Sequence, residues 1–243
     1  MAKTLLSNYI FCYTVAVGLL DFLYPKRCVR CKKFGEYVCP NCFTSISFDP
    51  AMICLVCGRP SIDALTHPRC RGHYTIDGCF AIVSYSGIIK KLLYQYKYRP
   101  NLSDLRSFLA ALFYEGMIQN ELLYKQLDNA LLVPVPLHAV RLRSRGYDQV
   151  ALLTKNVSKL SDLPAEQLLR RVKKTSSQYG LKREERVRNM KDAFEVLNNN
   201  AKEKTLLLVD DIVTSGTTLA EAARVLKKAG YGKVYGLAFA HGQ

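Results

Sequence analysis

The chain has 243 residues, of which 49% are hydrophobic and 23% are charged. This is the composition of ordinary globular proteins, and it excludes wholesale disorder and a fibrous repeat. Its 35 Lys and Arg residues against 20 Asp and Glu give a net charge of +15. Such an excess predicts attraction to polyanions: nucleic acid, an anionic membrane surface or phosphorylated small molecules.

The first 24 residues are expected to form a helix that packs on the rest of the protein. Its apolar run, Ile10–Leu20, has about eleven residues and is too short to cross a hydrocarbon core, which needs roughly twenty. A signal peptide is the alternative, but the segment has Lys3 alone in its charged region and no small-x-small cleavage site before Cys28. We therefore expect no transmembrane segment here.

Seven of the nine cysteines lie between Cys28 and Cys70. With one histidine they form two sets of paired knuckles: Cys28, Cys31, Cys39 and Cys42, then Cys54, Cys57, Cys70 and His73. Two residues between ligands let one turn aim both at one ion, and four soft ligands suit tetrahedral zinc. We therefore predict a double zinc ribbon over residues 25–78.

The alternative for each set is secreted disulfides or buried thiols, and His67 competes with His73 for the fourth position of the second set. Zinc thiolates imply a reducing compartment, so a cytoplasmic location is expected. Cys12 and Cys79 are expected to be small buried hydrophobic residues.

Beyond residue 78, short apolar runs alternate with helical periodicity. Strands are expected at 79–85, 130–135, 205–209 and 233–239, and helices at 88–98, 105–118, 149–160, 164–173 and 219–229. Such alternation predicts an α/β domain over residues 79–243, with a mostly parallel sheet flanked by helices.

The stretch from Arg141 to Lys191 is strongly basic. It holds 14 Lys or Arg and 5 Asp or Glu, and 14 − 5 gives +9 of the net charge. From Lys174 to Asn200 its secondary-structure pattern is weak. A solvated surface is one reading of this stretch, and a phosphate-binding loop region is the other.

The most informative segment runs from Thr205 into Asp210 and Asp211. A buried strand ends in the two carboxylates, and a loop of hydroxyl residues around Gly216 leads into a helix. Carboxylates at the carboxyl end of a parallel strand stand where open α/β sheets bind ligands, and backbone amides at a helix start bind anions. Thr217 or Thr218 is expected to cap the helix, Thr218 through a capping box with Glu221. The segment predicts a ribose 5-phosphate pocket.

This segment resembles the phosphoribosyl diphosphate motif of type I phosphoribosyltransferases. Two further stretches look like the ComF (ComFC, GntX-like) family, which is associated with natural competence and DNA uptake in bacteria. They are Val133–His138 with Arg141 and Arg145–Gln149, and then Gln178, Leu181, Arg186, Asn189 and Phe194. The double zinc ribbon completes that layout, and the resemblance covers nearly the whole chain.

The resemblance implies a type I phosphoribosyltransferase fold and a site for phosphoribosyl diphosphate. Asp210 and Asp211 would be the catalytic pair, holding the ribose hydroxyls directly or through magnesium. The 5-phosphate would lie on Thr214, Ser215, Gly216, Thr217 and Thr218. Arg145 and Arg141, with magnesium, would neutralise the departing diphosphate, and the region from Arg171 to Lys174 would close as a lid.

A second hypothesis is nucleic-acid binding. Cations and tyrosines interleave between Lys90 and Arg99, a pattern that suits single-stranded DNA, although an amphipathic helix with buried tyrosines would also produce it. The expected DNA surface lies around Lys90–Arg99 and Arg141–Arg145. Competence helicase and DNA-processing proteins are the expected protein partners. No acceptor signature is readable, so transfer activity is left open. The alternative function is nucleotide salvage, with transfer of ribose 5-phosphate to a nitrogenous base.

Overall fold

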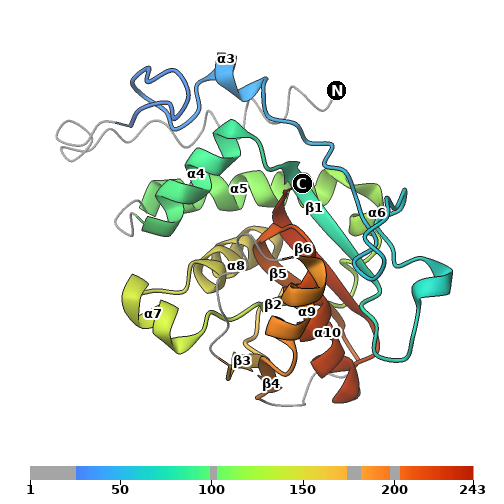
Figure 1. The fold of residues 1–243 in the computed structure, drawn as a ribbon. Helices are drawn as coiled ribbons and strands as arrows, with labels where there is room; N and C mark the ends of the chain where they lie inside the picture. The colour runs from blue at the N-terminus through green and yellow to red at the C-terminus, as the bar shows by residue number, and fades with distance from the viewer. Residues whose placement is uncertain (1–25, 99–102, 174–181, 198–202, 243) are drawn as a thin grey trace.

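The computed structural model describes residues 26–98, 103–173, 182–197 and 203–242. Four parallel strands form its central sheet in the spatial order β1-β6-β5-β2 (Figure 1). Their bounds are Gly78–Ser84 (β1), Ala130–Pro134 (β2), Thr205–Val213 (β5) and Val234–His241 (β6). The predicted α/β class with a parallel sheet is confirmed.

Helices cover both faces of this sheet (Figure 1). One face carries α4 (Gly87–Tyr98), α5 (Ser103–Gln119) and α8 (Gln149–Ser161), and the other carries α9 (Arg183–Met190) and α10 (Thr217–Lys228). The shorter elements are α3 (Pro40–Phe43), a 3-10 turn (Pro68–Cys70), α6 (Glu121–Tyr124) and α7 (Ala139–Arg145). β3 (Leu169–Arg171) and β4 (Phe194–Val196) pair as a separate two-stranded antiparallel sheet, and α9 lies between them in the chain.

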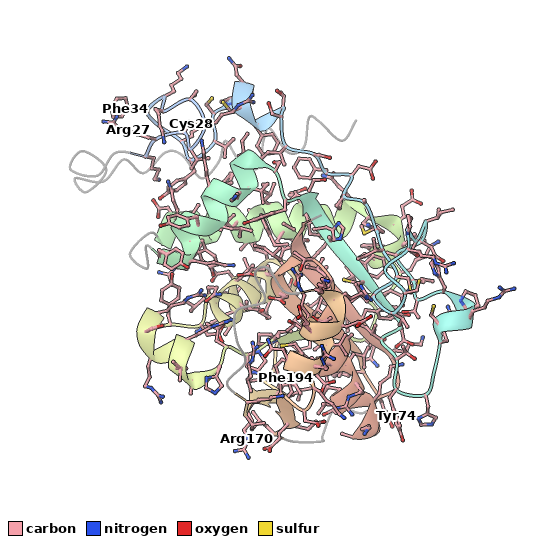
Figure 2. All side chains as sticks on the ribbon, in the orientation of Figure 1. Arg27, Cys28, Phe34, Tyr74, Arg170 and Phe194 are labelled. Carbon is pink, nitrogen blue, oxygen red and sulfur yellow. The ribbon has the colours of Figure 1, made fainter. Side chains whose placement is uncertain are left out.

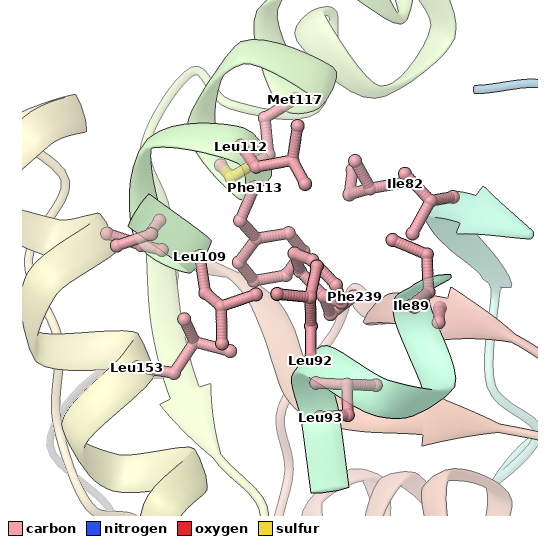
Figure 3. Packing of buried hydrophobic residues seen from close by; sticks show 14 of the residues in the cluster. Ile82, Ile89, Leu92, Leu93, Leu109, Leu112, Phe113, Met117, Leu153 and Phe239 are labelled. Carbon is pink, nitrogen blue, oxygen red and sulfur yellow. The ribbon is translucent and has the colours of Figure 1, made fainter. Parts of the chain in front are cut away.

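Alternate residues of each strand enter two separate hydrophobic clusters. In β5, Leu207 and Val209 join the cluster under α4, α5 and α8, whereas Leu206 and Leu208 join the cluster under α10. In the first cluster, Phe113 of α5 meets Phe239 of β6 and the leucines of α4 (Figure 3). Because both faces are covered, the strands appear in the sequence as continuous apolar runs.

The helix predicted at 164–173 is wrong. Pro164 and Glu166 instead bond the edge strand: the Leu132 amide donates to the Pro164 carbonyl at 2.9 Å, and the Glu166 amide donates to the Leu132 carbonyl at 3.0 Å. The chain then enters β3, which pairs antiparallel with β4, and the sequence pattern did not indicate either strand. Pairing with the open edge of β2 outweighs a weak helical periodicity.

The cysteine-rich region packs against the α/β domain instead of standing alone. Lys26 forms an ion pair with Asp104 of α5 at 2.7 Å, and the rings of Tyr37 and Phe108 lie 6.4 Å apart. The tip of this region carries Arg27, stacked at 4.0 Å over the ring of Phe34 (Figure 2).

The expected N-terminal helix, residues 1–24, lies outside the described residues, as do Cys12, Arg99, Lys174, Gln178 and Leu181. Among the residues that are described, no helix combines the length and apolarity needed to cross a membrane.

Candidate functional site

The two acidic residues lie within β5, near its carboxyl end. The strand was expected to stop at residue 209, but it continues to Val213 because it stays paired with β6. The Asp211 amide donates to the Asp210 carboxylate at 2.8 Å. Side chains of successive strand residues leave opposite faces, so Asp211 approaches the α4 and α8 side, where Lys97 and Gln149 lie.

Asp210 is the most perturbed carboxyl group of the site. Burial, with the neighbouring Asp211 charge, raises the pKa of Asp210 to about 7, although Lys97 and Arg171 oppose the shift. The carboxyl group therefore exchanges its proton near neutral pH. Ionisable groups with strongly shifted pKa values cluster at functional sites.

Lys97 of α4 contacts the acid pair directly. Its ammonium group lies 2.7 Å from Asp211 Oδ2, and the two side chains are 20% and 10% exposed. The buried Gln149 adds a bond from its side-chain amide to the same oxygen at 3.4 Å. The sequence pattern predicts Lys97 on a nucleic-acid surface, and helical periodicity does not indicate that it reaches a strand more than a hundred residues away.

The segment of residues 145–149 positions Lys97 and Gln149 beside Asp211. Asp148 caps α8 by accepting bonds from the amides of Val150 at 2.9 Å and Ala151 at 3.0 Å, and it also accepts from Leu137. The Tyr147 hydroxyl donates to the carbonyl of Tyr96. Through these bonds the 145–149 segment joins the loop after β2 to α4, and it keeps Lys97 and Gln149 beside Asp211.

The hydroxyl-rich loop follows β5 directly. Thr214 is exposed, Ser215 and Thr218 are partly buried, and Thr217 is buried. The predicted capping by Thr217 or Thr218 is wrong: the residue before α10 is Gly216, in the left-handed region at φ 69°, with no side-chain cap. Glu221, the proposed partner in the capping box, instead binds Arg224 and the amide of Asp192.

The start of α10 still offers the backbone amides on which the predicted phosphate site depends. The first turn of a helix leaves backbone amides without intrahelical partners, and its dipole favours an anion. Thr214 receives a hydrogen bond from Arg186 at 3.0 Å, so a guanidinium group also lies beside the loop.

The predicted diphosphate arginines lie on α7. Arg141 and Arg145 line a pocket of about 300 Å³ together with Lys97, Tyr98, Ser144 and Tyr147. The Arg145 guanidinium lies 5.6 Å from the centre of the Tyr98 ring. Because Lys97 borders this pocket and also touches Asp211, the cationic pocket adjoins the acid pair.

The predicted lid is only partly described. Arg171 belongs to β3, where its guanidinium donates to Met190 Sδ at 3.3 Å and lies 5.6 Å from the ring centre of Phe194. Burial lowers the pKa of Arg171, and so does the charge of Arg141. Arg171 thus packs against β4 and α9, and Lys174, the other end of the predicted lid, lies outside the described residues.

The cysteines gather into two clusters of four potential ligands. The first is the predicted set, Cys28, Cys31, Cys39 and Cys42, and the ligand atoms within each cluster lie within 4.8 Å of one another. Four sulfurs at this spacing fit tetrahedral zinc. Although burial opposes it, backbone amides of Cys31, Cys39 and Arg30 lower the pKa of Cys28 to about 6, which favours the thiolate that a metal needs.

The second cluster corrects the sequence prediction. It contains Cys54, Cys57, His67 and Cys70. His67, which the sequence left as the competitor, takes the place expected for His73, whose ring packs edge-on against Tyr74 at 4.6 Å. Zinc would take His67 Nδ1, the atom that lies 3.4 Å from Cys57 Sγ, while Nε2 lies 3.0 Å from the Pro60 carbonyl. Cys79 is buried, as predicted, and burial raises its pKa to about 12.

Two family models match the chain. The double zinc ribbon domain matches residues 19–71, and the phosphoribosyl transferase domain matches residues 114–238, which is about half of the chain. The glutamine phosphoribosylpyrophosphate amidotransferase of Bacillus subtilis is a structural match over 60% of this chain and 30% of that one. Its TM-score is 0.39 at 18% identity.

Three curated relatives carry names that refer to competence or to DNA utilization. Competence protein F of Haemophilus influenzae is 39% identical over 112 residues, which is 44% of this chain and 49%, or about half, of that protein. Competence protein ComFC of Bacillus subtilis is 27% identical over 82% of this chain and 81% of the relative. DNA utilization protein YhgH of Escherichia coli is 28% identical over 73% and 85%. The chain therefore belongs to the phosphoribosyltransferase domain family, and its double zinc ribbon places it in the ComF group.

Proposed function

We propose that the chain binds phosphoribosyl diphosphate at the carboxyl end of β5. The carrying observation is that one segment joins the acid pair, Asp210 and Asp211, to the amide-rich start of α10. The loop of residues 214–218 holds the 5-phosphate, and the carboxylates hold the ribose hydroxyls. These are the donors and acceptors that a sugar phosphate needs at neighbouring points.

The diphosphate end of the ligand faces the pocket of α7. Arg141, Arg145 and Lys97 supply three cations there, and guanidinium groups pair well with phosphate oxygens. Carboxylate oxygens of Asp210 and Asp211 suit magnesium, a hard cation that takes oxygen ligands and bridges phosphates. For magnesium to reach Asp211, the Lys97 ammonium group must leave the carboxylate and turn toward the pocket.

Such a site would support transfer to a nitrogen nucleophile. In that reaction the new nitrogen–carbon bond forms at the anomeric carbon, and diphosphate leaves with the electron pair of the broken carbon–oxygen bond. Positive charge that builds on the sugar is stabilised by the ionised acid pair, and the cations of α7 stabilise the leaving group.

The binding proposal is tested by calorimetric titration with phosphoribosyl diphosphate, with and without magnesium. Asp211→Ala should weaken binding at least tenfold, which is roughly 1.4 kcal/mol. The control is Asp128→Ala, which removes an exposed acid. Asp128 precedes the amino end of β2, whereas the acid pair lies near the carboxyl end of β5. Unchanged affinity in the Asp211 variant would overturn the assignment.

We also propose a role in DNA uptake, with binding of single-stranded DNA along α4. The names of the relatives support the role. Tyr94 and Tyr98 are 65% and 57% exposed with ring centres 4.8 Å apart, and Lys90 and Lys91 are exposed on the same helix. Exposed rings stack on bases while cations follow phosphates.

Part of the predicted DNA surface is excluded by the structure. Tyr96 is 2% exposed, and its hydroxyl donates to the carbonyl of Gln149 at 2.5 Å. Lys97 is held by Asp211. The proposed surface therefore consists of Lys90, Lys91, Tyr94 and Tyr98, with Arg145 beside it.

Fluorescence anisotropy of a labelled oligonucleotide tests this surface. Binding should fall steeply as salt rises, because each neutralised phosphate releases counterions. Tyr94→Ser should weaken binding about fivefold or more, since stacking on one base is worth roughly 1–3 kcal/mol. Tyr124→Ser, which alters a 61% exposed tyrosine on α6, is the control. No binding at micromolar protein and low salt would return nucleotide salvage to first place.

A further inference from the structure

The second cysteine cluster lies against the loop that we assign to the 5-phosphate. Leu55, between the ligand residues Cys54 and Cys57, is 4% exposed. Its side chain covers Gly216: a Cβ on that glycine would lie 2.3 Å from Leu55 Cδ2. Gly216 also has φ at 69°. The knuckle and the loop therefore fit together only with glycine at this position.

Arg183, the first residue of α9, bonds both partners. Its guanidinium donates to the carbonyls of Leu55 at 2.5 Å and Val56 at 2.9 Å, and to the Ser215 carbonyl at 3.3 Å. One planar, permanently charged group thus joins the turn of the metal knuckle to the loop. One helical turn later, Arg186 bonds the hydroxyl of Thr214 at 3.0 Å.

The carbonyls of Leu55 and Val56 belong to the turn between two residues of the second cluster, Cys54 and Cys57. The turn closes through the Gly58 amide, which donates to the Cys54 carbonyl at 2.8 Å, and the Cys54 amide, which donates to the Arg59 carbonyl at 2.9 Å. A bound metal would hold Cys54 and Cys57 at one point and fix this turn. Without it, the four-residue knuckle has little core of its own to keep its shape.

We propose that the metal-loaded second cluster, acting through Arg183 and Leu55, holds the 214–216 backbone in its anion-binding shape. Arg183 and Leu55 are positioning residues, because they touch the loop and not the ligand. The inference rests on the proposed function, since it assumes that this loop receives the 5-phosphate. The second zinc site would therefore support the loop that binds the ligand, whereas the first stabilises the scaffold.

The first cluster provides a matched control. It is tied to α5 through Lys26 with Asp104 and Tyr37 with Phe108. The backbone bonds of its two knuckles and the side-chain bonds of Arg30, Cys31 and Thr44 stay within residues 26–46. Removing a ligand from each cluster therefore separates a local effect on the loop from a general effect of losing zinc.

The experiment compares four variants of the full chain with the wild type. Cys57→Ser opens the second cluster and Cys31→Ser opens the first; Arg183→Met removes the link, and Arg188→Met changes an exposed arginine on the same helix. Zinc content is measured by elemental analysis, and affinity by calorimetry with phosphoribosyl diphosphate and magnesium. Hydrogen exchange of the amides of residues 214–219 reports on the loop without ligand.

Cys57→Ser and Arg183→Met should each weaken binding at least tenfold and speed exchange of the loop amides. Cys31→Ser and Arg188→Met should change both by less than twofold. Equal effects of Cys57→Ser and Cys31→Ser, or normal loop exchange in Arg183→Met, would overturn the inference. If the wild type fails to bind the ligand, the proposed function falls, while loop exchange still decides whether the second cluster holds the loop.

Discussion

Lys97→Met removes the cation that touches Asp211 across 2.7 Å. At an effective dielectric constant of ~20, two unit charges at that separation attract by roughly 6 kcal/mol. Desolvation of the lysine offsets about half of this, because both side chains are largely buried. We therefore expect the free energy of unfolding to fall by about 3 kcal/mol at pH 8, as it does when one partner of a buried pair is removed.

The loss should depend on pH with a definite sign. Lys97 lowers the pKa of Asp210, which burial raises to about 7, so its removal raises that pKa further. A carboxyl group with a folded pKa above its unfolded value, near ~4, destabilises the protein increasingly as pH rises from there through the folded pKa. The Lys97→Met deficit should therefore be smaller at pH 6 than at pH 8.

Urea denaturation at pH 6 and pH 8, in zinc-containing buffer, measures both effects. Lys91→Met, on the exposed side of the same helix, is the control and should stay within about 0.5 kcal/mol of the wild type. Magnesium should stabilise Lys97→Met more than the wild type, because the ion no longer displaces an ammonium group. Equal losses in the two variants, or a Lys97→Met loss that does not change with pH, would refute the reasoning.

Two further predictions concern the acid pair and the second metal site. Affinity for phosphoribosyl diphosphate with magnesium should rise by up to roughly tenfold per pH unit below 7, because Asp210 loses its proton there. Ionisation of the ligand phosphates also contributes to this rise, and Asp210→Asn should remove only the remaining part. Equal slopes of affinity against pH in the wild type and in Asp210→Asn, measured by calorimetry, would contradict the assignment. Elemental analysis should give two zinc ions per chain in the wild type and in His73→Ala, but about one in His67→Ala; two in His67→Ala would reinstate His73 as the ligand.

The sequence alone determined the features that depend on local spacing. Apolar runs in β1, β2, β5 and β6 indicated a parallel sheet, because strands covered on both faces carry apolar side chains at every position. The first cysteine set was predicted completely, since two knuckles of fixed spacing leave one way to surround an ion. The acids and the loop after them were found for the same reason: they are contiguous in the chain.

The tertiary structure decided the features that depend on contacts between distant segments of the chain. The segment 164–173 is extended and not helical, because the open edge of β2 at Leu132 offers hydrogen-bond partners to its backbone. A local sequence pattern does not indicate such partners. Gly216, rather than a threonine, is the residue before α10, and the packing of Leu55 over this position leaves no room for a Cβ there. His67 replaced His73 because the choice depends on how the chain folds back and not on the spacing from Cys70. Lys97 and Arg183 reach the site from helices that are remote in sequence, and charge placed by folding has no signature in periodicity or composition.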